Sequence, residues 1–194
     1  MKQVEKETIN EIIVNKSRFI CILIPINNKE EIKNIINNYK NKYKDATHYC
    51  TAYIIDSYMK CDDDGEPSGT AGIPILNVLK NNELNYVLCL VIRYFGGIKL
   101  GAGGLVRTYS KAVSETIKKA NIIDLTKGYY LEITFNYDDI KTINNTLKNI
   151  DIKKEFNEKI LYSFKISKTN FNKIENILNE KTNIIKKESI LTKA

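Results

Sequence analysis

Two stretches of the chain hold the side chains best suited to chemistry. Residues 93 to 112, RYFGGIKLGAGGLVRTYSKA, contain five of the nine glycines and two of the three arginines. Residues 61 to 74, CDDDGEPSGTAGIP, place four carboxylates within positions 62 to 66. Arginines and exposed backbone amides bind anions, whereas grouped carboxylates bind cations or transfer protons. The first stretch therefore predicts an anion-binding site, and the second predicts an acidic loop.

The glycine-rich stretch lies between an apolar run, VLCLVI at residues 87 to 92, and apolar residues with helical spacing from Leu105 onward. A strand, a glycine loop and a helix in this order expose unpaired amides and the positive end of the helix dipole. We therefore expect a surface that binds phosphate or nucleic acid, formed by Arg93, Tyr94, Gly96, Gly97, Lys99, Gly101, Gly103, Gly104 and Arg107. We expect the acidic loop residues Asp63, Asp64 and Glu66 to lie near this surface.

Each of these features also has a purely structural interpretation. Glycines allow a tight turn, or close packing of a strand against a helix, without any ligand. Arg93 and Arg107 can serve as buried counter-charges for the acidic loop. Tyr94, Phe95 and Tyr109 can pack in the core or stack on exposed RNA bases. The sequence leaves these alternatives open.

The common catalytic and cofactor motifs do not occur in the sequence. Gly96 and Gly101 have the spacing of a phosphate-binding loop, but no Lys-Ser or Lys-Thr pair follows them. The acidic loop could offer oxygen ligands to Mg²⁺ or Ca²⁺, yet an EF-hand would need glycine at the position of Pro67. His48 is the single histidine, and no catalytic triad can be assembled by spacing. We therefore expect no catalytic residue, no metal and no cofactor.

The composition is that of an ordinary globular protein, with 43% hydrophobic residues in a chain of 194. The apolar run at residues 19 to 26 is too short to span a bilayer, and acidic residues precede it where a signal peptide would be basic. We therefore expect a cytoplasmic protein without a membrane segment. The four cysteines lack CxxC spacing, so neither a disulfide framework nor a zinc site is predicted. The net charge of +7 is spread along a chain rich in Lys, Asn and Ile, so it gives little support to nucleic-acid binding by itself.

Hydrophobic periodicity predicts an α+β protein of two domains, residues 1–127 and 128–194. The first domain is expected to contain strands at 8–14, 18–24, 49–56 and 86–94 and helices at 29–43, 75–79 and 105–120. The second is expected to contain strands at 129–135, 152–156, 159–166 and 183–187 and helices at 138–149 and 170–180. This βαββαβ order is that of a ferredoxin-like domain.

Four motifs of the first domain occur in this order: KSRF at 16–19, THYCTAYI at 47–54, DDGEPSGTAGIPIL at 63–76 and RYFGGIKLGAGGLVRTYSKA at 93–112. With these motifs the chain resembles the YigZ/IMPACT family, in particular its bacterial YigZ-like branch. The resemblance implies an N-terminal domain with the ribosomal protein S-five domain-two-like α/β fold. It also implies a ferredoxin-like C-terminal domain similar to domain V of elongation factor G. That factor places the same two folds next to each other, so the resemblance implies contact with RNA or the ribosome.

Eukaryotic IMPACT proteins are similar only over the first domain, and they regulate translation initiation by competing for an activator of a kinase that phosphorylates an initiation factor. The RWD domain that they use is not found in this sequence, so we do not expect that partner here. We expect a non-enzymatic cytoplasmic protein that binds RNA or the ribosome and influences translation, with a translation-related protein as a further partner. The alternatives are an enzyme or binding protein for a small phosphorylated or nucleotide-like ligand at the glycine-rich loop, and a protein-protein adaptor.

Overall fold

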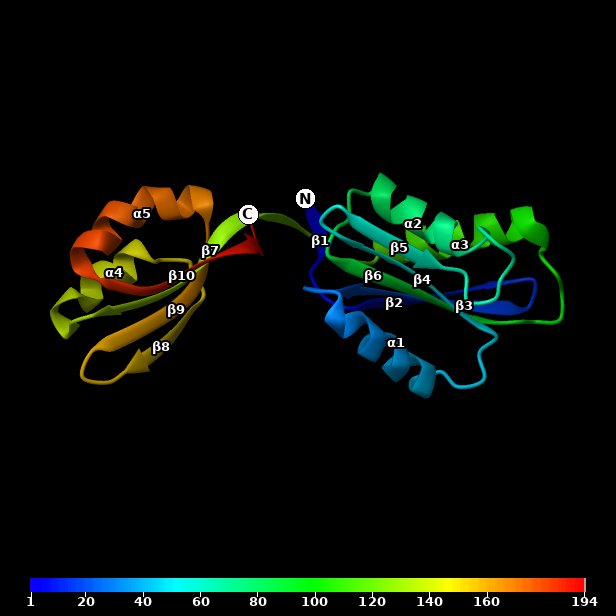
Figure 1. The fold of residues 1–194 in the computed structure, drawn as a ribbon, viewed down its shortest axis with the longest axis horizontal. Helices are drawn as coiled ribbons and strands as arrows, with labels where there is room; N and C mark the ends of the chain where they lie inside the picture. The colour runs from blue at the N-terminus through cyan, green and yellow to red at the C-terminus, as the bar shows by residue number, and fades with distance from the viewer. Residues whose placement is uncertain (194) are drawn as a thin grey trace. The chain divides into compact units, whose positions relative to one another are not determined.

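The uninterrupted apolar run at residues 87 to 92 forms β6 (Val87–Tyr94), the central strand of a five-stranded sheet in the N-terminal part of the chain (Figure 1). The structure is a computed structural model that describes residues 1–193. Every β6 residue except Tyr94 is buried. Helices cover both faces of this sheet, which is why the run shows no alternation of apolar and polar residues.

The N-terminal unit, residues 1–123, contains each predicted element, most of them with changed ends, together with two short strands, at residues 2–4 and 58–62, that the sequence pattern does not predict. Its other strands are β1 (Lys2–Val4), β2 (Thr8–Val14), β3 (Ser17–Pro25), β4 (His48–Ile55) and β5 (Tyr58–Asp62). Its helices are α1 (Glu30–Lys42), α2 (Gly72–Asn81) and α3 (Gly101–Ile117). The five-stranded sheet is antiparallel throughout, in the order β2-β3-β6-β4-β5.

The largest differences from the sequence-based expectation are at β5 and at the start of α3. The hydrophobic pattern does not reveal β5, because each of its residues is exposed or half-buried at the sheet edge. Helix α3 begins at Gly101, although the periodicity predicts a start at Leu105. Most helical stability comes from packing, here of Tyr109 and Val113 in the core, so three weak helix formers can occupy the first turn. The glycines from position 101 onward thus belong to a helix N-terminus and not to a loop.

Two hydrophobic cores, one on each face of the sheet, stabilise the N-terminal unit (Figure 1). Successive residues of a strand point to opposite faces. Ile20 of β3 accordingly packs with Ile32 of α1 on one face. Phe19 packs with Ile75 of α2 and Tyr109 of α3 on the other face. The residues described below as a site lie on the α2 and α3 side.

The C-terminal unit, from Asp124 onward, has the ferredoxin-like element order that the sequence predicts. Its strands are β7 (Ile122–Phe135), β8 (Ile152–Phe156), β9 (Ile160–Ser167) and β10 (Asn183–Lys193). Its helices are the short 3-10 helix η1 (Tyr137–Asp139), α4 (Ile140–Thr146) and α5 (Lys168–Lys181). The antiparallel order β10-β7-β9-β8 places β7 and β9 in the middle, and α4 and α5 cover one face of the sheet (Figure 1). Among the helices of residues 1–193, none combines the length and apolar character needed to cross a membrane.

The chain divides into its two units within β7, between Ile123 and Asp124. Gly128, where the sequence pattern restarts, lies inside this strand opposite Ser167 of β9 and Ile190 of β10. The predicted strand at residues 129–135 is therefore only the second half of a longer one. The predicted domain boundary between residues 127 and 128 stays a prediction.

Gly96 lies where the β2–β3 turn meets the segment that follows β6. Asn15 and Lys16 form this turn with positive φ angles of 46° and 63°. A Cβ atom on Gly96 would lie 2.0 Å from the Lys16 carbonyl carbon, and the Gly96 N–H donates to Ser17 Oγ at 3.1 Å. Only glycine fits this close approach of two backbones. Gly96 therefore fixes the exit of β6, from which the glycine-rich segment continues.

We predict that Gly96→Ala lowers the free energy of unfolding by about 3 to 5 kcal/mol, because its methyl group would overlap rigid backbone. Gly97→Ala is the matched control, since nothing lies within 4 Å of a Cβ there and only the φ of +85° is unfavourable. That cost is about 1 to 2 kcal/mol. Urea unfolding of both variants measures the difference, and equal losses would contradict the close-approach argument.

Candidate functional site

A pocket of about 410 Å³ lies between the end of β6 and the start of α3. This volume falls within the range of about 300 to 1,000 Å³ that is typical of small-molecule sites. Its walls come from four segments: the start of β4, the acidic loop, the end of β6 and the start of α3. The lining residues are Thr47, His48, Glu66, Pro67, Arg93, Phe95, Lys99, Leu100, Gly101, Ala102 and Leu105.

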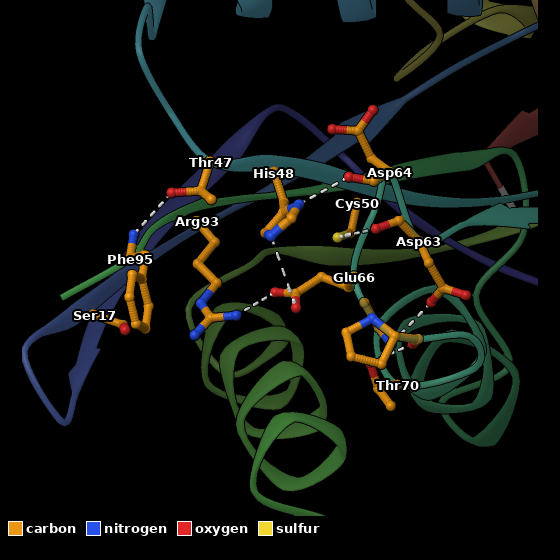
Figure 2. Close-up of polar contacts among 12 residues, drawn as sticks. Ser17, Thr47, His48, Cys50, Asp63, Asp64, Glu66, Thr70, Arg93 and Phe95 are labelled. Carbon is orange, nitrogen blue, oxygen red and sulfur yellow. Dashed lines mark hydrogen bonds and ion pairs between the residues drawn. The ribbon is translucent and has the colours of Figure 1, made fainter. Parts of the chain in front are cut away.

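Glu66 is a nearly fully buried carboxylate at the inner end of the pocket. Its Oε1 accepts hydrogen bonds from Arg93 Nη1 at 2.5 Å and from the Tyr109 hydroxyl at 2.7 Å. Its Oε2 lies 3.8 Å from His48 Nε2. Figure 2 shows the carboxylate between the His48 ring and the Arg93 guanidinium. We call Glu66, Arg93 and His48 the polar floor of the pocket.

Arg93 supplies the positive charge that neutralises Glu66. The residue is only 5% exposed, and its Cζ lies 5.3 Å from the Phe19 ring centroid and 5.5 Å from the Phe95 ring centroid. Both distances are within the range of cation–π contact. Its Nε is buried and has no hydrogen-bond partner within residues 1–193. A buried donor left unpaired costs about 1 to 3 kcal/mol, so the polar floor keeps one unsatisfied donor.

Asp64 fixes the position of His48. Its side chain accepts from the Tyr49 N–H at 2.7 Å and pairs with Lys40 at 3.3 Å, while its carbonyl oxygen lies 2.8 Å from His48 Nδ1 (Figure 2). Because a carbonyl oxygen can only accept, Nδ1 carries a proton. The other ring nitrogen, Nε2, faces Glu66.

Asp63 caps helix α2 from the acidic loop. Its carboxylate accepts from the backbone N–H groups of Gly69 at 2.8 Å, Ala71 at 3.0 Å and Gly72 at 2.7 Å. Burial alone would raise the pKa of Asp63, but these three hydrogen bonds to the charged form together outweigh it and leave the pKa lowered. The acidic loop is thus held as a rigid support for Glu66.

Cys50 and Tyr109 extend the polar contacts beneath the floor. Cys50 Sγ lies 3.0 Å from the Asp63 carbonyl oxygen and 3.3 Å from the Tyr109 hydroxyl oxygen. Burial raises the pKa of Cys50 to about 12 and also raises the pKa of Tyr109. Both groups are therefore protonated at neutral pH, and the Cys50 thiol is not activated as a nucleophile.

The outer edge of the pocket is basic. Helix α3 has no side-chain cap and no acidic residue in its first turn, so its free N–H groups and dipole favour an anion. Lys99 is exposed just before the helix. A Cβ on Gly103 would lie 3.5 Å from Arg107 Nη1, which shows that the exposed Arg107 side chain lies over the same turn. We call Lys99, Arg107 and the first turn of α3 the basic rim.

The structure brings part of the predicted site together. Glu66, Arg93, Lys99 and Gly101 line the pocket. The predicted residues outside the pocket lining are Asp63, Asp64, Tyr94, Gly96, Gly97, Gly103, Gly104 and Arg107. Their roles in binding, like those of the lining residues, stay predictions.

Two of the aromatic residues considered for base stacking are engaged elsewhere. Tyr109 is fully buried in the core, as its structural interpretation predicts. Tyr94 is half-buried, donates its hydroxyl to the Lys44 carbonyl at 3.1 Å and lies 5.2 Å from the Arg18 guanidinium. Phe95 is 46% exposed and lines the pocket. Of the three, Phe95 is the one with a free ring surface at the site.

His48 is the pocket residue that sequence reasoning undervalues. A lone histidine on a strand indicates core packing, and no motif links it to the acidic loop. Its position becomes informative only once β4 is known to pair with β6, because His48 then lies directly opposite Arg93. Within the part of the chain that the structure describes, no three His, Cys, Asp or Glu side chains are grouped to hold a metal ion.

Comparison with known proteins gives consistent matches. Residues 15–117 match the family model of the Impact N-terminal domain. The chain is 43% identical over 142 residues to the IMPACT family member YvyE of Bacillus subtilis (strain 168), covering 72% of this chain and 65% of that protein. It is 35% identical over 111 residues to the IMPACT family member YigZ of Escherichia coli (strain K12), covering 55% of this chain and 54% of that protein. The chain thus spans about half to two thirds of the length of these relatives.

A solved structure with a similar fold matches along nearly the whole chain. It is named as the crystal structure of a hypothetical protein, and the match covers 94% of this chain and 95% of that chain with a TM-score of 0.63. The sequence identity is 24%. The likeness therefore supports the fold, including the ferredoxin-like unit, and says nothing about function.

We predict that Glu66→Gln lowers the free energy of unfolding by about 3 to 5 kcal/mol, because the buried Arg93 loses its counter-charge. Glu11→Gln is the matched control, since Glu11 pairs with Arg18 at 2.9 Å on the surface and its loss should change stability little. Urea unfolding monitored by circular dichroism compares the two. Equal midpoints for both variants would show that the buried pair is not a structural centre.

We also predict that Asp63→Asn costs about 1.5 to 3 kcal/mol at neutral pH, the usual value of a hydrogen bond to a charged group. Because the pKa of Asp63 is lowered in the folded protein, its stabilisation is present above the pKa of an unfolded aspartate, about 4. It is lost as the pH falls through the lower, folded value. The gap between wild type and variant in the free energy of unfolding should accordingly narrow in acid. Asp151→Asn, at an exposed position, is the control and should leave stability at neutral pH close to that of wild type.

Proposed function

We propose, from the premise that this chain belongs to the IMPACT family, that it is a non-enzymatic protein that acts in translation by binding RNA through the basic rim. The partner in this proposal is RNA, free or within the ribosome, in the cytoplasm, and a translation-related protein is a second partner. One observation carries the proposal: an uncapped helix N-terminus, with two exposed cationic side chains, lies beside a preformed pocket.

The chemistry of the basic rim suits a phosphate group. The free N–H groups at the start of a helix point at an anion, and the Lys99 ammonium adds a mobile positive charge. Arg18 and Arg93 pair with Glu11 and Glu66, whereas Arg107 forms no ion pair within residues 1–193. Its guanidinium therefore remains available to hold two phosphate oxygens at once.

The open face of the C-terminal sheet is a weaker candidate for RNA contact. Residues opposite the helix-covered face include Lys153 next to Glu155 on β8 and Lys186 next to Glu188 on β10, and these pairs are 2.8 and 3.5 Å apart. Acidic side chains there offset the basic ones. This balance favours the N-terminal unit as the RNA-binding part and leaves the open face better suited to a protein partner.

Arg107→Ala should weaken RNA binding by about 1 to 3 kcal/mol, because a charge-assisted hydrogen bond is lost. It should also flatten the dependence of log affinity on log salt by about 0.7 to 0.9. Arg107→Lys keeps the charge without the planar fork, so its RNA affinity should lie between those of wild type and Arg107→Ala. Fluorescence anisotropy with a labelled single-stranded oligoribonucleotide at several salt concentrations measures all three.

The control is Lys80→Ala, which removes an exposed positive charge at the far end of α2. We expect it to leave both affinity and salt slope close to wild type. Because Arg107 is exposed, its replacement should also leave the melting temperature nearly unchanged. A destabilised Arg107→Ala protein with wild-type affinity would end the proposal and assign Arg107 a structural role.

A further inference from the structure

We infer that the pocket holds one nucleotide unit, with its base on the polar floor and its phosphate on the basic rim. This inference rests on the proposed function, because it uses the same rim. The inference goes further by naming the chemical class of the ligand in the pocket beneath that rim, a nucleotide. Two sources share this chemistry, a free nucleotide and one unstacked nucleotide of an RNA strand.

The Glu66–Arg93 pair in the polar floor carries no net charge, but the floor still offers hydrogen bonds. The charges of Glu66 and Arg93 cancel at 2.5 Å, so the floor does not attract a net anion. Glu66 Oε2 is an acceptor that lies 3.8 Å from His48 Nε2. The Arg93 Nε is a buried donor without a partner in the described chain. A group that donates to Glu66 Oε2 and accepts from the Arg93 guanidinium would pair with both.

The remaining walls favour a flat ring. Phe95 is 46% exposed, and its backbone N–H is held by Thr47 Oγ1 at 3.0 Å, so its place beside the pocket is fixed. Leu100, Leu105 and Pro67 add apolar surface. A nucleobase has a stacking face and an edge with adjacent donors and acceptors. An aliphatic ligand would leave the floor unsatisfied, and a phosphate on the floor would meet the Glu66 carboxylate.

The difference in charge between the polar floor and the basic rim sets the orientation of the nucleotide. Only the basic rim carries uncompensated positive charge, from Lys99, Arg107 and the α3 dipole. The phosphate should therefore stay outside and the base should point inward. A nucleotide would use both surfaces in this arrangement. Phosphate alone would bind at the basic rim and leave the hydrogen-bonding groups of the polar floor without partners.

The test is isothermal titration calorimetry of the full chain with the four nucleoside 5′-monophosphates, ribose 5-phosphate and inorganic phosphate. We expect at least one nucleoside monophosphate to bind about tenfold or more tightly than ribose 5-phosphate, which lacks the base. Phe95→Leu keeps apolar volume and removes the ring, so it should abolish this preference and leave ribose 5-phosphate binding unchanged. Phe156→Leu, at a 56% exposed phenylalanine of the C-terminal unit, should change nothing.

His48 gives a second readout, because it is the single histidine of the chain and yields one set of imidazole NMR signals. A bound base should shift these signals, and ribose 5-phosphate should not. Equal affinity for nucleotide and ribose 5-phosphate, or an unchanged preference in Phe95→Leu, would overturn the inference.

The two proposals fail in different ways. RNA binding that depends on Arg107 but shows no base preference would leave the proposed function standing and remove this inference. Nucleoside monophosphates that bind as expected, without competing with an oligoribonucleotide that binds at the rim, would identify a free nucleotide as the ligand. Competition between the two would identify one nucleotide of an RNA strand.

Discussion

The buried pair between Glu66 and Arg93 is the interaction on which the N-terminal unit depends most. Through it the acidic loop is joined to β6, and through the Tyr109 hydroxyl the same carboxylate is joined to α3. A buried ion pair of this kind contributes little net stability but makes the loss of either member costly. It therefore acts as a constraint on geometry, because only one arrangement of loop, strand and helix satisfies both charges. These contacts hold the acidic loop, β6 and α3 at the spacing that leaves the pocket between them.

Hydrophobic periodicity was sufficient to predict most of the architecture. The predicted strands at residues 86–94 and 8–14 and the ferredoxin-like order follow from runs and alternations that the chain displays directly. The edge strand β5 and the start of α3 could not be predicted in this way. The first lacks buried residues, and the second consists of glycines whose helical state is imposed by packing further along the helix. The family resemblance of the four motifs is confirmed by the match over residues 15–117.

The candidate site was only partly predictable, for a related reason. Glycine and charge content identified the two segments that border the pocket, but not the pairing between them. Sequence gives Arg93 and Arg107 the same two interpretations, a phosphate ligand or a counter-charge. The structure separates them, because Arg93 is buried against Glu66 while Arg107 lies exposed over the first turn of α3. Which residues share a pocket depends on strand order, and the position of His48 opposite Arg93 is a property of the sheet that no local pattern contains.

The environment of Arg93 also bears on how this sequence can drift. The chain has three arginines among 30 basic residues and is rich in the amino acids that AT-rich codons specify. Under such a mutational bias arginine codons are readily exchanged for lysine codons. At position 93 the guanidinium contacts two aromatic rings and a carboxylate together, and a lysine ammonium is a compact, strongly hydrated charge that cannot stack in the same way. At position 93 a drift in composition from arginine toward lysine and the stability of the folded protein would therefore act in opposite directions.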